Sequence, residues 1–131
     1  MNCPRILAVD GNLPFLQMMK EVLETKGFEV TPASNLADAL RSLIIHPFDA
    51  LITELQLPLA EDGLTIVNAM RHCQPRALRI AISASPVLEG ATVFLPQKAD
   101  KILVKPFDFE HLAGLIRQRS AELASDLRNP T

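Results

Sequence analysis

The sequence predicts an α/β fold in which a five-stranded parallel sheet is covered by helices on both faces. Five short apolar runs of strand length occur along the chain, and each is followed by a stretch with apolar residues at helical spacing. Strands that alternate with helices form parallel sheets through right-handed crossovers. Five such units fit the doubly wound, flavodoxin-like strand order 2-1-3-4-5.

The first strand–helix unit is bounded by turn-forming residues. Residues 5–9 are a short apolar run, and Asp10 follows it directly. Asn12 is a favoured helix cap, and the apolar residues after it recur at helical spacing as far as Gly27, a residue type that commonly ends helices. These signals predict a buried strand and then a helix.

The second unit has a weaker strand and a clear helix. Residues 28–31 alternate between apolar and polar, which is typical of a strand near the edge of a sheet. Either Ser34 or Asn35 can cap the helix that follows. The helix is expected to end at His46-Pro47, because a residue before proline disfavours helical geometry.

The third strand is an apolar run that ends at the carboxylate of Glu54. A loop containing a proline then leads to Asp62-Gly63, which we expect to form a turn rather than to bind a ligand. The third helix is predicted to carry apolar residues from Leu64 to Cys73 and to end before Pro75.

Two further strands and a final helix complete the pattern. Residues 78–83 and 101–105 are predicted strands, and a weaker helical stretch over residues 86–97 separates them. Asp108 is positioned to cap the last helix. Residues 126–131 are expected to form a frayed tail.

The composition indicates one domain over residues 1–131, with a core over about residues 5–122. The chain is 48% hydrophobic, enough for a substantial core, and its net charge of −2 argues against binding to nucleic acid or to a membrane surface. No apolar segment approaches the roughly 20 residues that span a bilayer. Cys3 and Cys73 have no metal-binding spacing and are interpreted as reduced thiols of a cytoplasmic protein.

Charged side chains follow three of the predicted strands. Asp10 follows the first strand, Glu54 ends the third and Lys105 ends the fifth. Ligands bind outside the carboxyl ends of the strands in an open parallel sheet. We therefore expect these three side chains to meet in one shallow site.

Several short motifs stand at the ends of these strands. They are, in chain order, Ala8-Val9-Asp10-Gly11-Asn12, Ile52-Thr53-Glu54-Leu55-Gln56-Leu57-Pro58, Asp62-Gly63, Ile82-Ser83-Ala84 and Val104-Lys105-Pro106-Phe107. In this set and order the chain resembles the receiver domain of two-component response regulators, over about residues 5–122. The resemblance implies a signalling domain whose aspartate, at the end of the third strand, accepts a phosphoryl group from a histidine kinase.

The chain departs from that family pattern at two acidic positions. Glu54 stands where the family has the phosphoacceptor aspartate, and Gly11 stands where it has a second, metal-binding acid. The family's Mg²⁺ would be held here by Asp10, Glu54 and the backbone carbonyl of Gln56. Because Mg²⁺ demands near-ideal geometry, and because misplacing a reacting group by about 1 Å can cost about a hundredfold in rate, we expect no bound metal and at most very slow phosphorylation.

Glu54 has three possible roles. Its longer side chain could imitate an aspartyl phosphate by pairing with Lys105 and accepting a hydrogen bond from Ser83. It could instead form a purely structural ion pair with Lys105. Residual Mg²⁺-dependent phosphorylation is the third possibility.

The resemblance also implies a conformational relay and a partner surface. In the family, the hydroxyl at Ser83 acts as a switch together with an aromatic residue on the fifth strand, but Ile102 stands at that position here. Family members bind partners, or dimerise, through the face made by the fourth helix, fifth strand and fifth helix. The expected partner is a signalling protein, either a histidine kinase or a downstream effector, or a second copy of the chain.

The favoured function is a non-enzymatic, phosphorylation-independent interaction module without a cofactor. The alternative is a receiver that is weakly phosphorylated by a histidine kinase in the presence of Mg²⁺. A flavodoxin-type flavin carrier fits the fold class, but no glycine-rich phosphate-binding loop follows the first strand and the chain has no Tyr or Trp.

Overall fold

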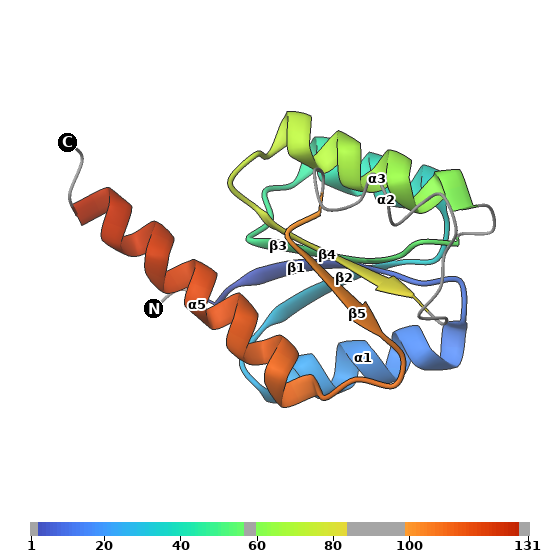
Figure 1. Cartoon of the computed structure of the whole chain (residues 1–131), viewed down its shortest axis with the longest axis horizontal. Coiled ribbons are helices and arrows are strands. Elements are labelled where there is room, and N and C mark those ends of the chain that lie inside the picture. The colour runs from blue at the N-terminus through green and yellow to red at the C-terminus, as the bar shows by residue number, and fades with distance from the viewer. Residues whose placement is uncertain (1–2, 57–59, 84–98, 129–131) are drawn as a thin grey trace.

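The computed structural model describes residues 3–56, 60–83 and 99–128 (Figure 1). Within these ranges the chain forms a five-stranded sheet flanked by helices. The weak helical stretch predicted over residues 86–97 lies outside the described residues.

The five strands are all parallel and follow the predicted order β2-β1-β3-β4-β5. Their bounds are Arg5–Val9 for β1, Glu29–Ala33 for β2, Ala50–Glu54 for β3, Leu78–Ser83 for β4 and Lys101–Val104 for β5. The prediction that the second strand lies at an edge is confirmed. The register pairs Val9 with Thr53, and Ser83 with Val104, so the carboxyl ends of these strands form one rim.

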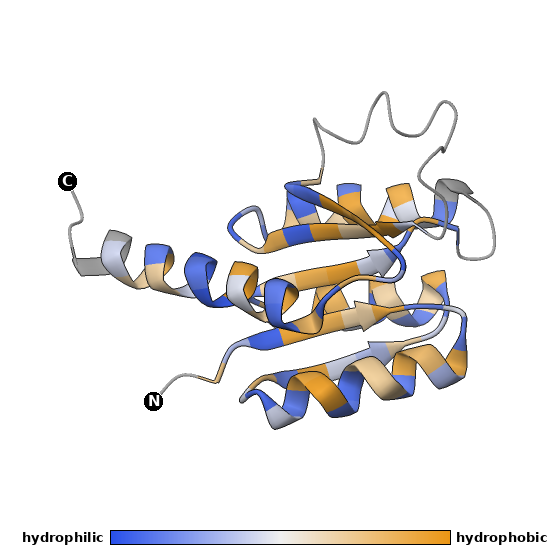
Figure 2. Ribbon diagram, turned by 60° about the horizontal axis from the view of Figure 1, so that its bottom comes forward, coloured by the Kyte–Doolittle hydropathy of each residue, from blue (hydrophilic) through white to orange (hydrophobic). Residues whose placement is uncertain are grey.

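Helices cover both faces of the sheet, as predicted (Figure 1). Their bounds are Leu13–Thr25 for α1, Leu36–Ile45 for α2, Ala60–Cys73 for α3 and Phe109–Arg128 for α5. Helices α1 and α5 lie on one face, and α2 and α3 lie on the other. Each face has its own hydrophobic core, and Figure 2 shows how strongly hydrophobic residues are concentrated on the central strands.

The predicted caps are confirmed at the starts of three helices. The Asn12 side chain accepts a hydrogen bond from the N–H of Phe15, and Asn35 rather than Ser34 caps α2 by accepting from the N–H of Asp38. Asp108 accepts from the N–H of Glu110 at 2.9 Å. Each bond satisfies a backbone donor that has no partner within its helix.

Two predicted boundaries are wrong. The sequence predicts a turn at Asp62-Gly63 before the third helix, but α3 begins at Ala60 and contains both residues. The final helix runs to Arg128, past residue 126, where the sequence predicts the start of a frayed tail. Its C-terminal end extends beyond the sheet (Figure 1). No described helix is long and apolar enough to cross a bilayer.

Candidate functional site

The site lies where β1, β3 and β5 end, as the sequence predicts. The side chain of Asp10 is fully buried, and the Nζ of Lys105 lies 2.9 Å from its Oδ2. Glu54 is half-buried and contacts the loop after β1. The three charges that are distant in sequence therefore converge on one rim of the sheet.

Both carboxylate oxygens of Asp10 have hydrogen-bond donors. Oδ2 accepts from the Lys105 ammonium at 2.9 Å, and Oδ1 accepts from the N–H of Asn12 at 2.8 Å. A buried carboxylate is tolerated only when it is paired and hydrogen-bonded, because burial removes its hydration. Asp10 is thus satisfied entirely by the protein's own groups.

Glu54 does not form the ion pair with Lys105 that the sequence suggested. Its Oε2 accepts a hydrogen bond from the backbone N–H of Gly11 at 3.1 Å, whereas the ion pair of Lys105 among the described residues is with Asp10. The physical reason is burial depth: the fully buried Asp10 loses more by remaining unpaired than the half-buried Glu54 does.

The surroundings of Glu54 disfavour its charged form. Burial is the main cause that raises the pKa of Glu54 above its ordinary value of 4.5, and the negative charge of Asp10 together with a hydrogen bond to that carboxyl group raises it further. The Gly11 N–H and the positive charge of Lys105 oppose this rise in pKa. The ammonium of Lys105 thus pairs with one carboxylate, that of Asp10, and acts on the other, that of Glu54, only through its charge.

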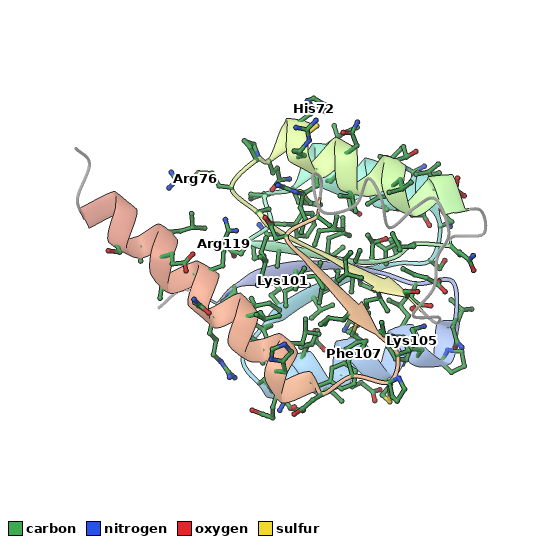
Figure 3. The ribbon with its side chains drawn as sticks, viewed as in Figure 1. His72, Arg76, Lys101, Lys105, Phe107 and Arg119 are labelled. Atoms are coloured by element: carbon green, nitrogen blue, oxygen red, sulfur yellow. The ribbon has the colours of Figure 1, made fainter. Side chains whose placement is uncertain are left out.

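An aromatic cluster lies beside the pocket lysine, and sequence reasoning missed its role. The Nζ of Lys105 lies 4.0 Å from the centroid of the Phe15 ring. That ring meets Phe107 edge-on at 6.1 Å, and Phe107 lies 5.2 Å from Phe109. In the sequence, Phe15 is only one of the apolar residues at helical spacing after Asn12. Two features of the sequence could have indicated the cluster: an aromatic residue three positions after the Asn12 cap, and Phe107 two positions after Lys105. Figure 3 labels Lys105 and Phe107.

Ser83 and Ile102 lie on the strands beside the site. Ser83 ends β4 and is 4% exposed, and its backbone carbonyl accepts the N–H of Lys105 at 2.8 Å. This bond fixes the backbone from which the lysine side chain extends. Ile102 lies on β5 and is 37% exposed.

Gly63 is a second feature that sequence reasoning misjudged. Its N–H donates to the carbonyl of Leu55 at 3.1 Å. A Cβ at this position would lie 2.4 Å from the Leu55 carbonyl oxygen and 2.6 Å from that of Glu54. The glycine therefore lets the first turns of α3 rest directly on the backbone that carries Glu54.

Comparisons with known proteins identify the family. The model of the "Response regulator receiver domain" family matches residues 6–117. The chain belongs to this family. It is thus a receiver domain of two-component signalling.

Relatives extend this result to longer proteins and solved structures. The transcriptional regulatory protein PrrA of Mycobacterium tuberculosis is 32% identical over 126 residues, which cover 93% of this chain and 54% of PrrA. This chain thus spans about half the length of the mycobacterial relatives. A signal receiver domain of an HD domain-containing protein from Pseudomonas fluorescens has a TM-score of 0.83 and 25% identity, covering 98% of this chain and 94% of that one. The response regulator TrrA of Thermotoga maritima, solved in complex with Mg²⁺ and BeF, has a TM-score of 0.74 and 25% identity. The match covers 88% of this chain and 98% of the TrrA chain.

The site residues do not fit the Mg²⁺ ion that the family implies. Gly11 offers no carboxylate, both oxygens of Asp10 accept N–H donors, and Glu54 accepts the N–H of Gly11. The described part of the chain contains no cluster of three or more His, Cys, Asp or Glu side chains arranged to hold a metal ion. A divalent cation at Asp10 would have to compete with the Lys105 ammonium at Oδ2 and with the N–H of Asn12 at Oδ1.

Proposed function

We propose that this receiver domain acts in two-component signalling through protein contacts that do not depend on phosphorylation at position 54. The observation that carries the proposal is that internal donors already satisfy the acidic site. The Lys105 ammonium and the N–H of Asn12 donate to the Asp10 carboxylate, and the N–H of Gly11 donates to Glu54. The Lys105 ammonium offsets the charge of Asp10, and a neutral backbone N–H holds Glu54.

The chemistry of phosphoryl transfer supports the same conclusion. The reaction depends on positioning the nucleophile and on neutralising the charge of the transferred group, usually with a metal ion. Glu54 is one methylene longer than aspartate, and its Oε2 is held by the N–H of Gly11. These residues supply neither the usual nucleophile position nor a pair of acids for a cation, so we expect no metal-dependent phosphoryl transfer at Glu54.

We further propose that Glu54 is a structural anchor for the loop between β1 and α1 rather than an imitation of a phosphate. An imitation would attract Lys105, as a phosphoryl group does in the family, yet the lysine pairs with Asp10. A carboxylate also carries less charge than a phosphate and fewer acceptor oxygens. Substituting Glu54→Gln should therefore leave binding of the signalling partner, a histidine kinase or an effector, unchanged.

The partner surface that we propose includes β5 and α5. Ile102 and Val104 lie two residues apart on the edge strand β5 and are 37% and 38% exposed. An edge strand presents unpaired backbone groups, and exposed apolar side chains on it favour pairing with another chain. This face could bind a signalling partner or a second copy of the chain.

Intact-mass spectrometry tests the proposal. The protein is incubated with Mg²⁺ and acetyl phosphate, beside a variant carrying Gly11→Asp and Glu54→Asp. Gly11 is exposed and lacks a positive φ, so its backbone accepts a side chain. We expect a phosphate adduct on the variant and none on the wild type. A stoichiometric adduct on Glu54 of the wild type would overturn the proposal and favour the weakly phosphorylated alternative.

A further inference from the structure

The ammonium of Lys105 is placed between two carboxylates that could each bind it. It pairs with Asp10 at 2.9 Å, yet its charge also acts on Glu54, as the lowering effect of Lys105 on the pKa of Glu54 indicates. Lysine has a flexible stem with four carbons and a point-like charge. Burial depth favours pairing with Asp10, and any further contact at the tip of the lysine adds to that preference or opposes it.

The backbone of Lys105 is fixed, but this alone does not choose between the carboxylates. The N–H of Lys105 donates to the Ser83 carbonyl at 2.8 Å, which attaches the end of β5 to β4. The side chain beyond that point is 20% exposed and has several rotatable bonds. Its direction must come from what it touches.

The Phe15 ring is the further contact at the tip of the lysine. The Nζ of Lys105 lies 4.0 Å from the ring centroid, well within the roughly 6 Å range over which an ammonium is attracted to an aromatic face. Phe15 thus occupies one side of the ammonium while Asp10 occupies another. The lysine is held by two different groups, the Asp10 carboxylate directly after β1 and the Phe15 ring in the first turn of α1.

The ring itself is held in place by its neighbours. The N–H of Phe15 donates to the capping side chain of Asn12 at 3.1 Å, which fixes the Phe15 backbone. Phe107 packs edge-on against the ring at 6.1 Å, and Phe109 lies at 6.4 Å. Because these contacts fix the ring, it presents one face to the lysine and loses little conformational freedom when the ammonium packs against it.

We propose that Phe15 is a positioning residue that holds the Lys105 ammonium on Asp10 and away from position 54. The inference rests on the proposed function and deepens it, because it names the residue that keeps position 54 without a cation. The Phe107 and Phe109 rings support Phe15 and act on the lysine through it.

The test uses Phe15→Leu, which keeps an apolar side chain but removes the aromatic face. Carbon-13 NMR follows the side-chain carboxyl of Glu54 during a pH titration of the full chain. Freed from Phe15, the ammonium would be shared between the two carboxylates, so the titration midpoint of Glu54 should fall by about half a pH unit or more. The conservative variant Phe15→Tyr retains an aromatic face and should keep the wild-type midpoint.

A matched control removes a different cation–aromatic contact. Arg117 lies over the ring of Phe28 with its Cζ 5.4 Å from the centroid, far along the chain from Glu54. Phe28→Leu should lower the stability of the protein but leave the Glu54 midpoint unchanged. A purely structural role for Phe15 would give this same pattern in Phe15→Leu, and that result would overturn the inference.

A second measurement separates failure of this inference from failure of the proposed function. Phe15→Leu is added to the variant carrying Gly11→Asp and Glu54→Asp, and the yield of phosphate adduct is compared by mass spectrometry. Release of Lys105 toward position 54 should raise the yield about tenfold, because a nearby cation stabilises the transferred group. An unchanged yield would count against the role of Phe15, whereas phosphorylation of the wild type would count against the proposed function.

Discussion

At the scale of single residues, two carboxylates and one ammonium group determine how the site behaves. Asp10 is fully buried and Glu54 is half-buried, so the depth of burial favours pairing of the lysine with Asp10. The remaining carboxylate accepts a backbone N–H instead. The site is therefore satisfied, but it keeps some repulsion between its two acids.

Glu54→Gln should make the protein more stable at neutral pH. The pKa of Glu54 in the folded protein is raised above 4.5, chiefly by burial, so the charged form is disfavoured by folding. This penalty is fully present at pH values above the folded pKa, and it disappears as the pH falls through that pKa toward 4.5. The glutamine amide can still accept the Gly11 N–H.

Urea unfolding of both proteins at about pH 7 and about pH 5 measures this effect. The stability advantage of Glu54→Gln should shrink as the pH falls, because only the wild type gains from protonation. An advantage that grows on acidification would show that the charged form of Glu54 stabilises the fold.

Removing Lys105 should lower the free energy of unfolding more than removing its partner Asp10. Lys105→Met leaves the buried Asp10 unpaired beside Glu54, and we expect a loss of about 3 kcal/mol in the free energy of unfolding. Asp10→Asn should cost about half as much or less, since Glu54 can then receive the ammonium. Chemical denaturation of the two variants at neutral pH measures both losses of stability. Equal losses would contradict the idea that Glu54 can receive the ammonium when Asp10 is removed.

The sequence allowed these three residues to be placed together but not paired correctly. Asp10, Glu54 and Lys105 follow strands, and strand ends of a parallel sheet meet at one rim, so convergence was predictable. The choice of partner for Lys105 depends on burial depth and on the Phe15 ring, and both arise from tertiary packing that residue types alone do not encode.

At the scale of elements, α3 and the strand that carries Glu54 touch through their backbones. Gly63 makes this approach possible, because any side chain at that position would meet the carbonyl groups of Glu54 and Leu55. The position of Glu54 therefore depends on a glycine that lies in a helix and makes no side-chain contact.

Gly63→Ala should destabilise the protein by about 1–3 kcal/mol, because its Cβ would lie 2.4 Å from the carbonyl oxygen of Leu55. Gly114→Ala is the matched control. Gly114 lies in α5, is exposed, and has no atom within 4 Å of the place that a Cβ would occupy, so the same substitution there should stabilise the helix by about 0.5–1 kcal/mol. Thermal unfolding distinguishes the two, and similar shifts in Tm would refute the close contact at Gly63.

Helix starts were easier to predict than this contact. Asn12, Asn35 and Asp108 cap their helices through local hydrogen bonds, which involve residues two or three positions along the chain. The start of α3 was mispredicted because Gly63 has the residue type of a turn, whereas its role depends on the backbone at the end of β3, which only the folded chain brings against it.

At the scale of the whole molecule, the two faces of the sheet are filled and β5 forms an exposed edge. The alternation of elements and the right-handed crossover rule left few topologies, and the strand order that we predicted among them is confirmed. How far apolar residues of β5 remain exposed could not be predicted, because exposure depends on the neighbouring layers.

If the β5–α5 face mediates self-association, Ile102→Asp should weaken it about tenfold or more, since a charge would enter an apolar contact. Ile44→Asp is the matched control, because Ile44 is 72% exposed on α2, on the other face of the sheet. Analytical ultracentrifugation over a range of concentrations reports the outcome. Equal weakening by both variants would place the contact elsewhere.

The backbone amides of Gly11 and Asn12 report most directly on whether internal donors satisfy the acidic site, since they donate to Glu54 and Asp10. Nitrogen-15 NMR can follow both resonances during titration with Mg²⁺ and beryllofluoride, beside the variant carrying Gly11→Asp and Glu54→Asp. We predict no saturable shift in the wild type and a saturable shift of the Asn12 amide in the variant. A saturable shift of Gly11 and Asn12 in the wild type would contradict the proposal that the site is already satisfied.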